Sequence, residues 1–207
     1  MTLKENASRI DVLNFLIRKF GFKRYLEIGI EDGNCFSEIK CEHKIGVDPD
    51  PKSKATIHQT SDDFFAENKF KFDLIFIDGL HTAQQVYQDT LNAIDALNEN
   101  GIIIFHDMLP ASEDAQVVPR GDREVWNGDC WKAFVVLRSS RPDLAMATIN
   151  TDHGLGFMMK GKQVCIENKT PLRLDWTNFV HYRDYWMNTI SVAKFESFCE
   201  GIIEQKK

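Results

Sequence analysis

The sequence predicts an α/β protein with a Rossmann-like, doubly wound and mostly parallel sheet. Short apolar segments alternate with helical segments from residue 24 to residue 107, a pattern typical of a parallel sheet covered by helices on both faces. Two of the apolar segments, Arg24–Ile28 and Phe72–Gly79, run into glycine turns. The length of 207 residues suits one α/β domain, so we expect a single domain over residues 1–207.

The first half of the predicted sheet begins after a helix. That helix is expected over Ser8–Phe20, where apolar residues share one face and Gly21 follows. Arg24–Ile28 reads as the first buried strand, because it is a brief apolar run bounded by turn signals. A short helix is expected over Gly33–Ile39, and Lys44–Asp48 reads as the second strand.

Three more strands are expected before residue 107. Ala55–Thr60 is predicted as the third strand, Phe72–Gly79 as the fourth and Gly101–Phe105 as the fifth. A helix over Thr82–Asn98 connects the fourth to the fifth, because its apolar residues recur at helical spacing. The carboxyl ends of all these parallel strands should meet at one edge of the sheet.

The pattern changes after residue 108. Leu109–Gly128 is polar, contains prolines and has no steady period, and so long a loop inside a domain is usually functional or mobile. We predict that it forms a lid over the substrate. A helix over Trp131–Arg138 follows, and then two paired strands over Pro142–Asp152 and Gly154–Lys160. A C-terminal helical appendage is expected over about 177–205, where aromatic residues could cover the sheet or form an oligomer surface.

Composition excludes several kinds of partner. The net charge of −6 gives no basic surface for nucleic acid. No apolar run is long enough to span a bilayer, and the N-terminal residues lack the apolar core of a signal peptide. The five cysteines are scattered without metal-binding spacing, which fits a reducing compartment. We therefore expect a cytoplasmic protein without nucleic-acid or membrane partners.

A candidate ligand site follows the first strand. Ligands of open α/β sheets bind at the carboxyl ends of the strands, where Glu27 and Gly29 lie. The spacing from Gly29 to Asp48 suits a carboxylate that binds a ribose, so the pattern indicates an adenosine-type ligand. Glu31 and Asp32 in the glycine turn would repel a pyrophosphate. The acidic turn therefore disfavours NAD and tolerates the positively charged sulfonium of S-adenosylmethionine.

Four segments, EIGIEDG, GVDPD, FDLIFIDGLH and NGIIIFHD, resemble class I S-adenosylmethionine-dependent methyltransferases, and within them the macrocin- and mycinamicin-type sugar O-methyltransferases. The resemblance covers residues 24–107 well and the rest loosely. It implies an antiparallel last strand in the sheet. It differs at the glycine loop, whose middle glycine is absent. The residues that it and the turn pattern assign to cofactor binding are Glu27, Gly29, Gly33, Asp48, Asp62 and Asp78.

Four reactive side chains follow the fourth and fifth predicted strands. Asp78 and His81 lie at one strand end, and His106 and Asp107 at the next; adjacent strands are about 4.8 Å apart, so these groups should converge. Two close carboxylates repel each other, and a divalent cation relieves that repulsion. We predict a Mg²⁺ site at Asp78 and Asp107, which His106 as a third ligand would shift toward Mn²⁺.

The resemblance implies that His81 is the general base and that Asp78 binds metal. His106 stands where the resemblance implies a second carboxylate. This difference weakens the metal prediction but does not affect the prediction that His81 is the base. Structural roles remain as alternatives: Asp78 could cap a helix, and His106 could be a core histidine.

The sequence therefore predicts an S-adenosylmethionine-dependent O-methyltransferase. The resemblance implies a small-molecule acceptor such as a sugar, a glycoside or a glycan precursor. The sequence leaves open whether the protein forms a homo-oligomer. Two alternatives also remain: an NAD-binding Rossmann oxidoreductase, which Glu31 and Asp32 disfavour, and a non-catalytic cofactor-binding subunit, which the intact carboxylates and His81 disfavour.

Overall fold

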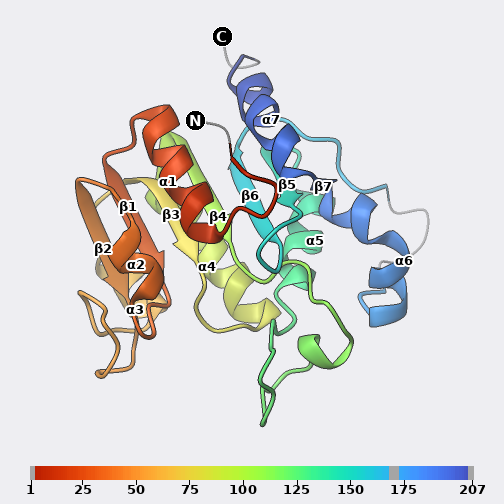
Figure 1. Ribbon diagram of the computed structural model, residues 1–207, viewed down its shortest axis with the longest axis horizontal. Coiled ribbons are helices and arrows are strands. Elements are labelled where there is room, and N and C mark those ends of the chain that lie inside the picture. The colour runs from red at the N-terminus through yellow and green to blue at the C-terminus, as the bar shows by residue number, and fades with distance from the viewer. Residues whose placement is uncertain (1–2, 168–172, 205–207) are drawn as a thin grey trace.

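A seven-stranded sheet forms the centre of the protein, with strand order β2-β1-β3-β4-β6-β5-β7 (Figure 1). The computed structural model describes residues 3–167 and 173–204. Within this part, β6 is the strand that runs antiparallel to both neighbours, and the remaining pairs are parallel. The predicted fold class is therefore confirmed. The strands are β1 (Arg24–Ile28), β2 (His43–Val47), β3 (Phe72–Ile77), β4 (Leu97–Phe105), β5 (Leu144–Ile149), β6 (Leu155–Lys160) and β7 (Thr189–Ile190).

Helices cover both faces of the sheet, as a doubly wound fold requires. Alternate side chains of each strand point to opposite faces, so Leu74 and Phe76 pack on one face while Ile75 and Ile77 pack on the other. The first face is covered by α1 (Arg9–Phe20), α2 (Asn34–Glu38) and α7 (Val192–Glu204). The second is covered by α3 (Ser61–Glu67), α4 (Ala83–Ala96), α5 (Trp131–Ser140) and α6 (Trp176–Met187).

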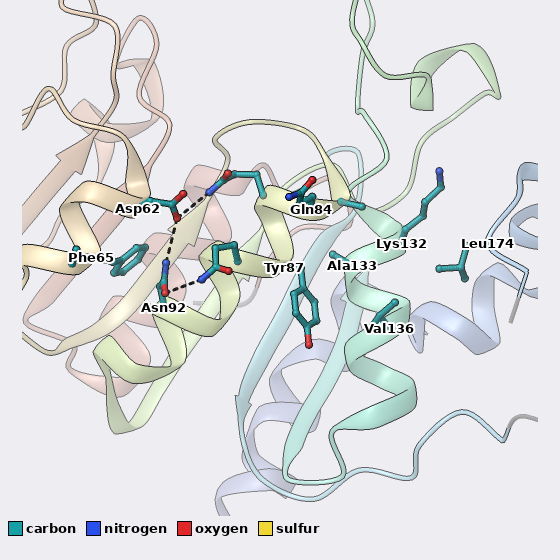
Figure 2. Close-up of a pocket in the computed structure, with 13 residues that line it drawn as sticks. Asp62, Phe65, Gln84, Tyr87, Asn92, Lys132, Ala133, Val136 and Leu174 are labelled. Atoms are coloured by element: carbon teal, nitrogen blue, oxygen red, sulfur yellow. Dashed lines mark hydrogen bonds between the residues drawn. The ribbon is translucent and has the colours of Figure 1, made fainter.

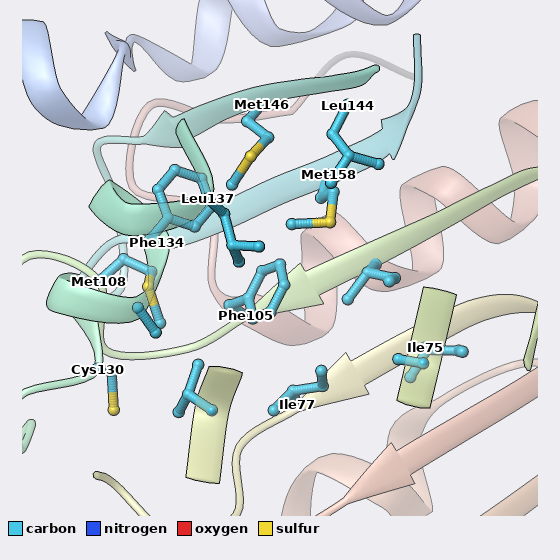
Figure 3. Close-up of a cluster of buried hydrophobic side chains, with 14 of the residues drawn as sticks. Ile75, Ile77, Phe105, Met108, Cys130, Phe134, Leu137, Leu144, Met146 and Met158 are labelled. Carbon is cyan, nitrogen blue, oxygen red and sulfur yellow. The ribbon is translucent and has the colours of Figure 1, made fainter. Parts of the chain in front are cut away.

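The core on the second face fixes the strands whose ends carry the candidate site. Phe134 of α5 packs edge-on against Phe105 of β4, with ring centroids 5.8 Å apart. Leu137 of α5 and Met158 of β6 lie in the same buried cluster (Figure 3). Burial of apolar surface contributes about 25 cal/mol per Å², so this packing stabilises the strands that carry the groups at the edge of the sheet.

The predicted third strand, Ala55–Thr60, is wrong. The segment makes only an isolated parallel bridge between Val47 and Ile57. Ile57 N–H donates to the Gly46 carbonyl at 3.0 Å, and its own carbonyl accepts from Asp48 N–H at 3.2 Å. The pairing stops there because Thr60 already caps α3, its hydroxyl accepting from the Asp63 N–H.

The boundary between α4 and β4 also differs from the prediction. The helix ends at Ala96 and β4 begins at Leu97, whereas the sequence pattern extended the helix to Asn98 and began the strand at Gly101. Asn98 is held in the strand by its side-chain amide, which donates to Asp73 at 2.6 Å. The register of β3 and β4 shifts at this point.

The C-terminal region is helical, as predicted, but it is divided. Asn188, with φ +48°, ends α6, and β7 adds two residues to the sheet edge before α7 begins. The end of the predicted appendage at residue 205 lies outside the described residues. In the described part of the chain, the helices are too short or too polar to cross a bilayer.

Candidate active site

The predicted site residues surround a cavity of about 970 Å³ at the carboxyl edge of the sheet. The ends of β1, β2, β3 and β4 contribute to its wall, together with the first residues of α1 and the turn between β5 and β6. Gly33 is the predicted residue that the wall does not include. The predicted residues that line the cavity are Glu27, Gly29, Asp48, Asp62, Asp78, His81, His106 and Asp107.

The glycine turn after β1 depends on Gly29. Its φ is +87°, a conformation that costs little only for glycine. A Cβ at this position would lie 2.6 Å from the Asp78 carbonyl carbon and 2.7 Å from the Gly79 Cα. Gly33, with φ +77°, caps the start of α2, where a Cβ would meet the Lys54 side chain at 2.7 Å. Both glycines therefore shape the turn, and Gly29 alone borders the cavity.

Asp48 organises this turn from the end of β2. One carboxylate oxygen accepts from the Ile30 and Glu31 N–H groups at 2.9 and 3.0 Å, and the other accepts from Asp50 N–H at 2.8 Å. Partial burial opposes ionisation, but these three donors outweigh it and lower the pKa of Asp48. Asp48 is therefore an anion that holds the acidic turn in place.

Glu27 is almost completely buried, with 1% of its surface exposed. The Tyr25 hydroxyl donates to its carboxylate at 2.5 Å. Burial raises the pKa of Glu27 to about 7, although the hydrogen bond from Tyr25 acts in the opposite direction. Near neutral pH this carboxyl group can thus either donate or accept a hydrogen bond toward the cavity.

Asp62 lies in the first turn of α3 and lines the same cavity. Its carboxylate is exposed and makes only long contacts, with Gln85 at 3.4 Å and Asn92 at 3.5 Å. Asp62 and Gln85 also line a second cavity, of about 890 Å³, which continues between α3, α4 and α5 (Figure 2). The adenine-binding role predicted for Asp62 stays a prediction.

Asp78 and His81 come together at the end of β3. The His81 Nε2 lies 3.4 Å from Asp78 Oδ1, and its Nδ1 lies 3.2 Å from Asp107 Oδ2. Nδ1 is fully buried and makes no aligned hydrogen bond, so Nε2 is the ring nitrogen that a substrate can reach. Burial opposes protonation of His81, but the two carboxylates outweigh it and raise its pKa.

His106 and Asp107 follow β4 and complete the predicted cluster. The His106 Nδ1 lies 3.2 Å from Asp78 Oδ1 and 3.1 Å from Asp107 Oδ2. Burial opposes protonation of His106, but Asp78 and the other carboxylates around the ring raise its pKa well above the ordinary range. Burial opposes ionisation of the partly buried Asp78, but its contacts with His106, His81 and Arg9 hold its pKa well below its usual range.

Two site residues were missed by the sequence analysis. Arg9 begins α1 and lies between Asp78 and Asp152, with Nη1 2.8 Å from Asp78 Oδ2 and Nη2 3.2 Å from Asp152 Oδ1. Asp152, in the turn between β5 and β6, also lies 3.3 Å from the His106 Nε2. Arg9 had one signal: a cation at a helix N-terminus opposes the helix dipole and needs a compensating anion. Asp152 had none, because aspartate is common in turns.

The predicted lid is anchored beside this cluster at its C-terminal end, and at its other end Leu109 N–H donates to the His153 carbonyl at 2.8 Å. Asn127 donates to Asp107, and a Cβ on Gly128 would overlap the His81 carbonyl. Trp126 stacks on the His81 ring, with centroids 4.9 Å apart and planes 15° from parallel. The middle of the segment, about residues 117–125, is mostly exposed. Motion of the lid stays a prediction, and it now concerns this middle part.

The predicted metal site has suitable distances between its ligand atoms, but its carboxylate oxygens already contact other donors. Ligand atoms of Asp78, His81 and Asp107 lie within 4.8 Å of one another, a spacing that a small cation could bridge. However, the carboxylate oxygens already contact donors from Arg9, His106, His81 and Asn127. In this arrangement the residues do not fit a divalent ion, because the ion would have to displace those donors.

Comparisons with known proteins agree with the fold. Residues 26–108 match a family model described as a methyltransferase domain. A search of curated proteins found no match to the chain.

Several solved structures resemble the chain. An S-adenosylhomocysteine-bound Podospora anserina methyltransferase, PaMTH1, has a TM-score of 0.57 and 18% identity, covering 74% of this chain and 79% of its own. A Bacillus cereus O-methyltransferase in complex with S-adenosylhomocysteine has a TM-score of 0.54 and 16% identity, covering 77% and 83%.

The O-methyltransferase TomG of Streptomyces achromogenes, involved in tomaymycin synthesis and solved with S-adenosylmethionine, has a TM-score of 0.54 and 12% identity, covering 72% and 78%. At these identities the structures show a shared fold. Together the comparisons support a methyltransferase domain over residues 26–108 and a Rossmann-like methyltransferase fold for the chain.

Proposed function

We propose that this protein is an S-adenosylmethionine-dependent O-methyltransferase that acts on a hydroxyl group of a small molecule. The observation that carries the proposal is the position of His81. It stands between two carboxylates in the wall of a cavity that the glycine turn after β1 and Asp48 also line. A base and a cofactor turn that face one cavity are what methyl transfer to a hydroxyl requires.

The cofactor is proposed to bind along the ends of β1, β2 and α3. A carboxylate has about four acceptor positions, and Asp48 uses three of them on backbone N–H groups. It therefore has one left for a ribose hydroxyl. Glu27 and Asp78 are proposed to supply acidic groups that favour the positively charged sulfonium, and Asp62 is proposed to meet the adenine amino group. Gly33 acts from behind the wall, by fixing the end of the turn.

When bound, S-adenosylmethionine supplies the methyl group, and the new oxygen–carbon bond forms as the carbon–sulfur bond breaks. His81 takes the acceptor's proton on Nε2. Three carboxylates, Asp78, Asp107 and Asp152, face one guanidinium and two imidazoles in this cluster. The cluster is electrically neutral only when both imidazoles are protonated. The neutral, base form of His81 therefore leaves a net negative charge, which favours uptake of the proton.

The acceptor is proposed to lie in the cavity beside His81 and the Trp126 that stacks on it. The cavity volume of about 970 Å³ is at the upper end of the range for small-molecule sites, about 300–1,000 Å³, so cofactor and acceptor could share it. Trp126 borders this region, and aromatic faces suit sugar rings. A sugar, glycoside or glycan precursor is the acceptor class that the sequence resemblance implies.

The test is methyl transfer from labelled S-adenosylmethionine to a panel of sugars, nucleotide sugars and phenolic glycosides. We expect product with the native protein. The His81→Ala variant should lose about 10²–10⁴ in turnover and bind S-adenosylhomocysteine within a few-fold of the native protein, since the base acts on the acceptor. His43→Ala, which changes an exposed histidine at the start of β2, is the matched control and should retain activity.

Three outcomes would contradict the proposal. Tight binding of NADH with no binding of S-adenosylhomocysteine would favour an oxidoreductase. Binding of S-adenosylhomocysteine without transfer to any member of the panel would favour a non-catalytic binding subunit. Near-native turnover of His81→Ala at every pH would remove His81 as the base.

A further inference from the structure

The Arg9 guanidinium is a permanent positive charge beside the carboxylates of Asp78 and Asp152. The Arg9 guanidinium contacts Asp78 through Nη1 at 2.8 Å, and it contacts Asp152 through Nε and Nη2, both at 3.2 Å. The Arg9 backbone N–H also donates to Asp152, at 2.6 Å. Arginine stays charged in proteins, and its planar fork suits paired carboxylates. Arg9 thus ties the first residue of α1 to the end of β3 and to the β5–β6 turn.

A second cation lies next to Arg9. His106 is 5% exposed and has carboxylates at both ring nitrogens: Asp78 and Asp107 near Nδ1, and Asp152 near Nε2. A carboxylate can only accept a hydrogen bond, so an imidazole between carboxylates is fully paired only when both nitrogens carry protons. His106 is therefore an imidazolium in this arrangement.

These cations contact the oxygens that a metal would need. Asp78 Oδ2 contacts Arg9, and Asp78 Oδ1 contacts His106 and His81. Asp107 Oδ2 contacts the same two imidazoles, and Asp107 Oδ1 accepts from Asn127. All four oxygens of the two carboxylates are thus engaged. With Arg9 and His106 charged, the cluster carries at most one net negative charge, so a divalent ion would leave it net positive and would be repelled by both cations.

We infer that Arg9 and His106 together take the place of a divalent cation, so that the site excludes Mg²⁺ and Mn²⁺ and the reaction proceeds without metal. The part of this inference that concerns the reaction rests on the proposed methyl transfer; the exclusion of metal does not. Arg9 is a positioning residue in this scheme. It fixes one oxygen of Asp78, and the other oxygen then faces His81 at 3.4 Å.

The experiment is a Mn²⁺ titration of the purified, chelator-treated protein, followed by electron paramagnetic resonance and by calorimetry. We expect no saturable Mn²⁺ site in the native protein. Arg9→Ala should gain a saturable Mn²⁺ site, with an affinity at least about tenfold higher than any residual binding by the native protein, because a unit charge close to the ligands is removed. Arg9→Lys keeps the charge and should still exclude the ion. Arg18→Ala removes an exposed arginine from the same helix and should behave as the native protein does.

Circular dichroism identifies any variant that fails to fold. If Arg9→Ala does not fold, Mn²⁺ binding by Arg9→Lys is compared with that of the native protein. A saturable Mn²⁺ site in the native protein that disappears in Asp107→Asn would overturn the inference, and so would Mn²⁺ binding by Arg9→Lys equal to that of Arg9→Ala. Because these readouts need no turnover, a native protein that excludes Mn²⁺ but methylates nothing would contradict the proposed function alone.

For an active preparation, chelation should leave turnover of the native protein unchanged. Arg9→Lys should lower turnover more than it raises the acceptor's KM, since the lysine cannot reproduce the fork that orients Asp78. Turnover of the native protein that disappears on chelation and returns with Mn²⁺ would refute metal-free transfer.

Discussion

Replacement of Gly29 by alanine should separate two costs that glycine avoids, backbone strain and steric overlap. Gly29 has φ +87°, and an added Cβ would press on the backbone of Asp78 and Gly79. Gly21, which ends α1, has φ +66° and nothing within 4 Å of an added Cβ. Gly21→Ala therefore measures strain alone, and Gly29→Ala measures strain plus overlap.

The expected magnitudes follow from this geometry. The left-handed conformation costs a non-glycine residue about 1–2 kcal/mol, so Gly21→Ala should lower the free energy of unfolding by about that amount. At Gly29 the Cβ would lie 2.6–2.7 Å from backbone atoms, whereas ordinary contacts begin near 3.4 Å. The ends of β1 and β3 must then move apart, and overpacking of this kind costs about 1–3 kcal/mol more.

Thermal unfolding followed by circular dichroism is the assay. For a chain of this size 1 kcal/mol shifts Tm by about 2–4 °C, so Gly29→Ala should melt about 2–12 °C below Gly21→Ala. Calorimetry should also show weaker binding of S-adenosylhomocysteine to Gly29→Ala and unchanged binding to Gly21→Ala. Equal Tm values for the two variants would show that the ends of β1 and β3 move apart freely and that the turn after β1 is not rigid.

Four further outcomes are expected. Asp48→Ala should weaken binding of S-adenosylhomocysteine in calorimetry, because it frees the turn and removes the ribose partner; unchanged affinity would remove Asp48 from the site. Burial raises the pKa of Glu27 from 4.5 to about 7. Its contribution to the free energy of unfolding, at most about 3 kcal/mol, is therefore present below pH 4.5 and is lost as pH rises through about 7. Chemical denaturation of Glu27→Gln should show a smaller loss of stability over this pH range. Turnover should rise with pH through the raised pKa of His81, since only the neutral ring is a base, and Asp107→Asn should move this rise to lower pH. Hydrogen exchange at residues 117–125 should be fast in the free protein and slow with cofactor and acceptor, and strong protection without ligands would show ordinary packed structure.

The parallel core was predictable because its signals are local. The segment FDLIFI, which β3 occupies, is apolar at every position but Asp73, as expected of a strand buried on both faces. Ala55–Thr60 failed although its burial alternates along the chain as in a strand. Alternation measures which side chains face inward, but a strand also needs a partner of sufficient length, and here pairing ends after Ile57.

The cluster at the strand ends was predicted in part for the same reason. Asp78, His81, His106 and Asp107 follow buried strands in the sequence, so their convergence could be inferred from sheet geometry. Arg9 and Asp152 join them from an N-terminal helix and a distant hairpin turn, and no local pattern records such a contact. The missing partners are also the ones that decide the charge of the site.

The contact between Arg9 and Asp152 spans 143 residues of sequence, and that separation has a consequence for biosynthesis. At about 5–20 residues per second, roughly 7–30 s pass between synthesis of the first helix and synthesis of the hairpin turn that receives it. During that interval the guanidinium has no carboxylate from the turn, and the apolar face of α1 lacks α7, which follows still later. The nascent chain therefore cannot assemble the candidate active site before the β5–β6 turn is synthesised, and the apolar face of the first helix lacks part of its cover until α7 follows.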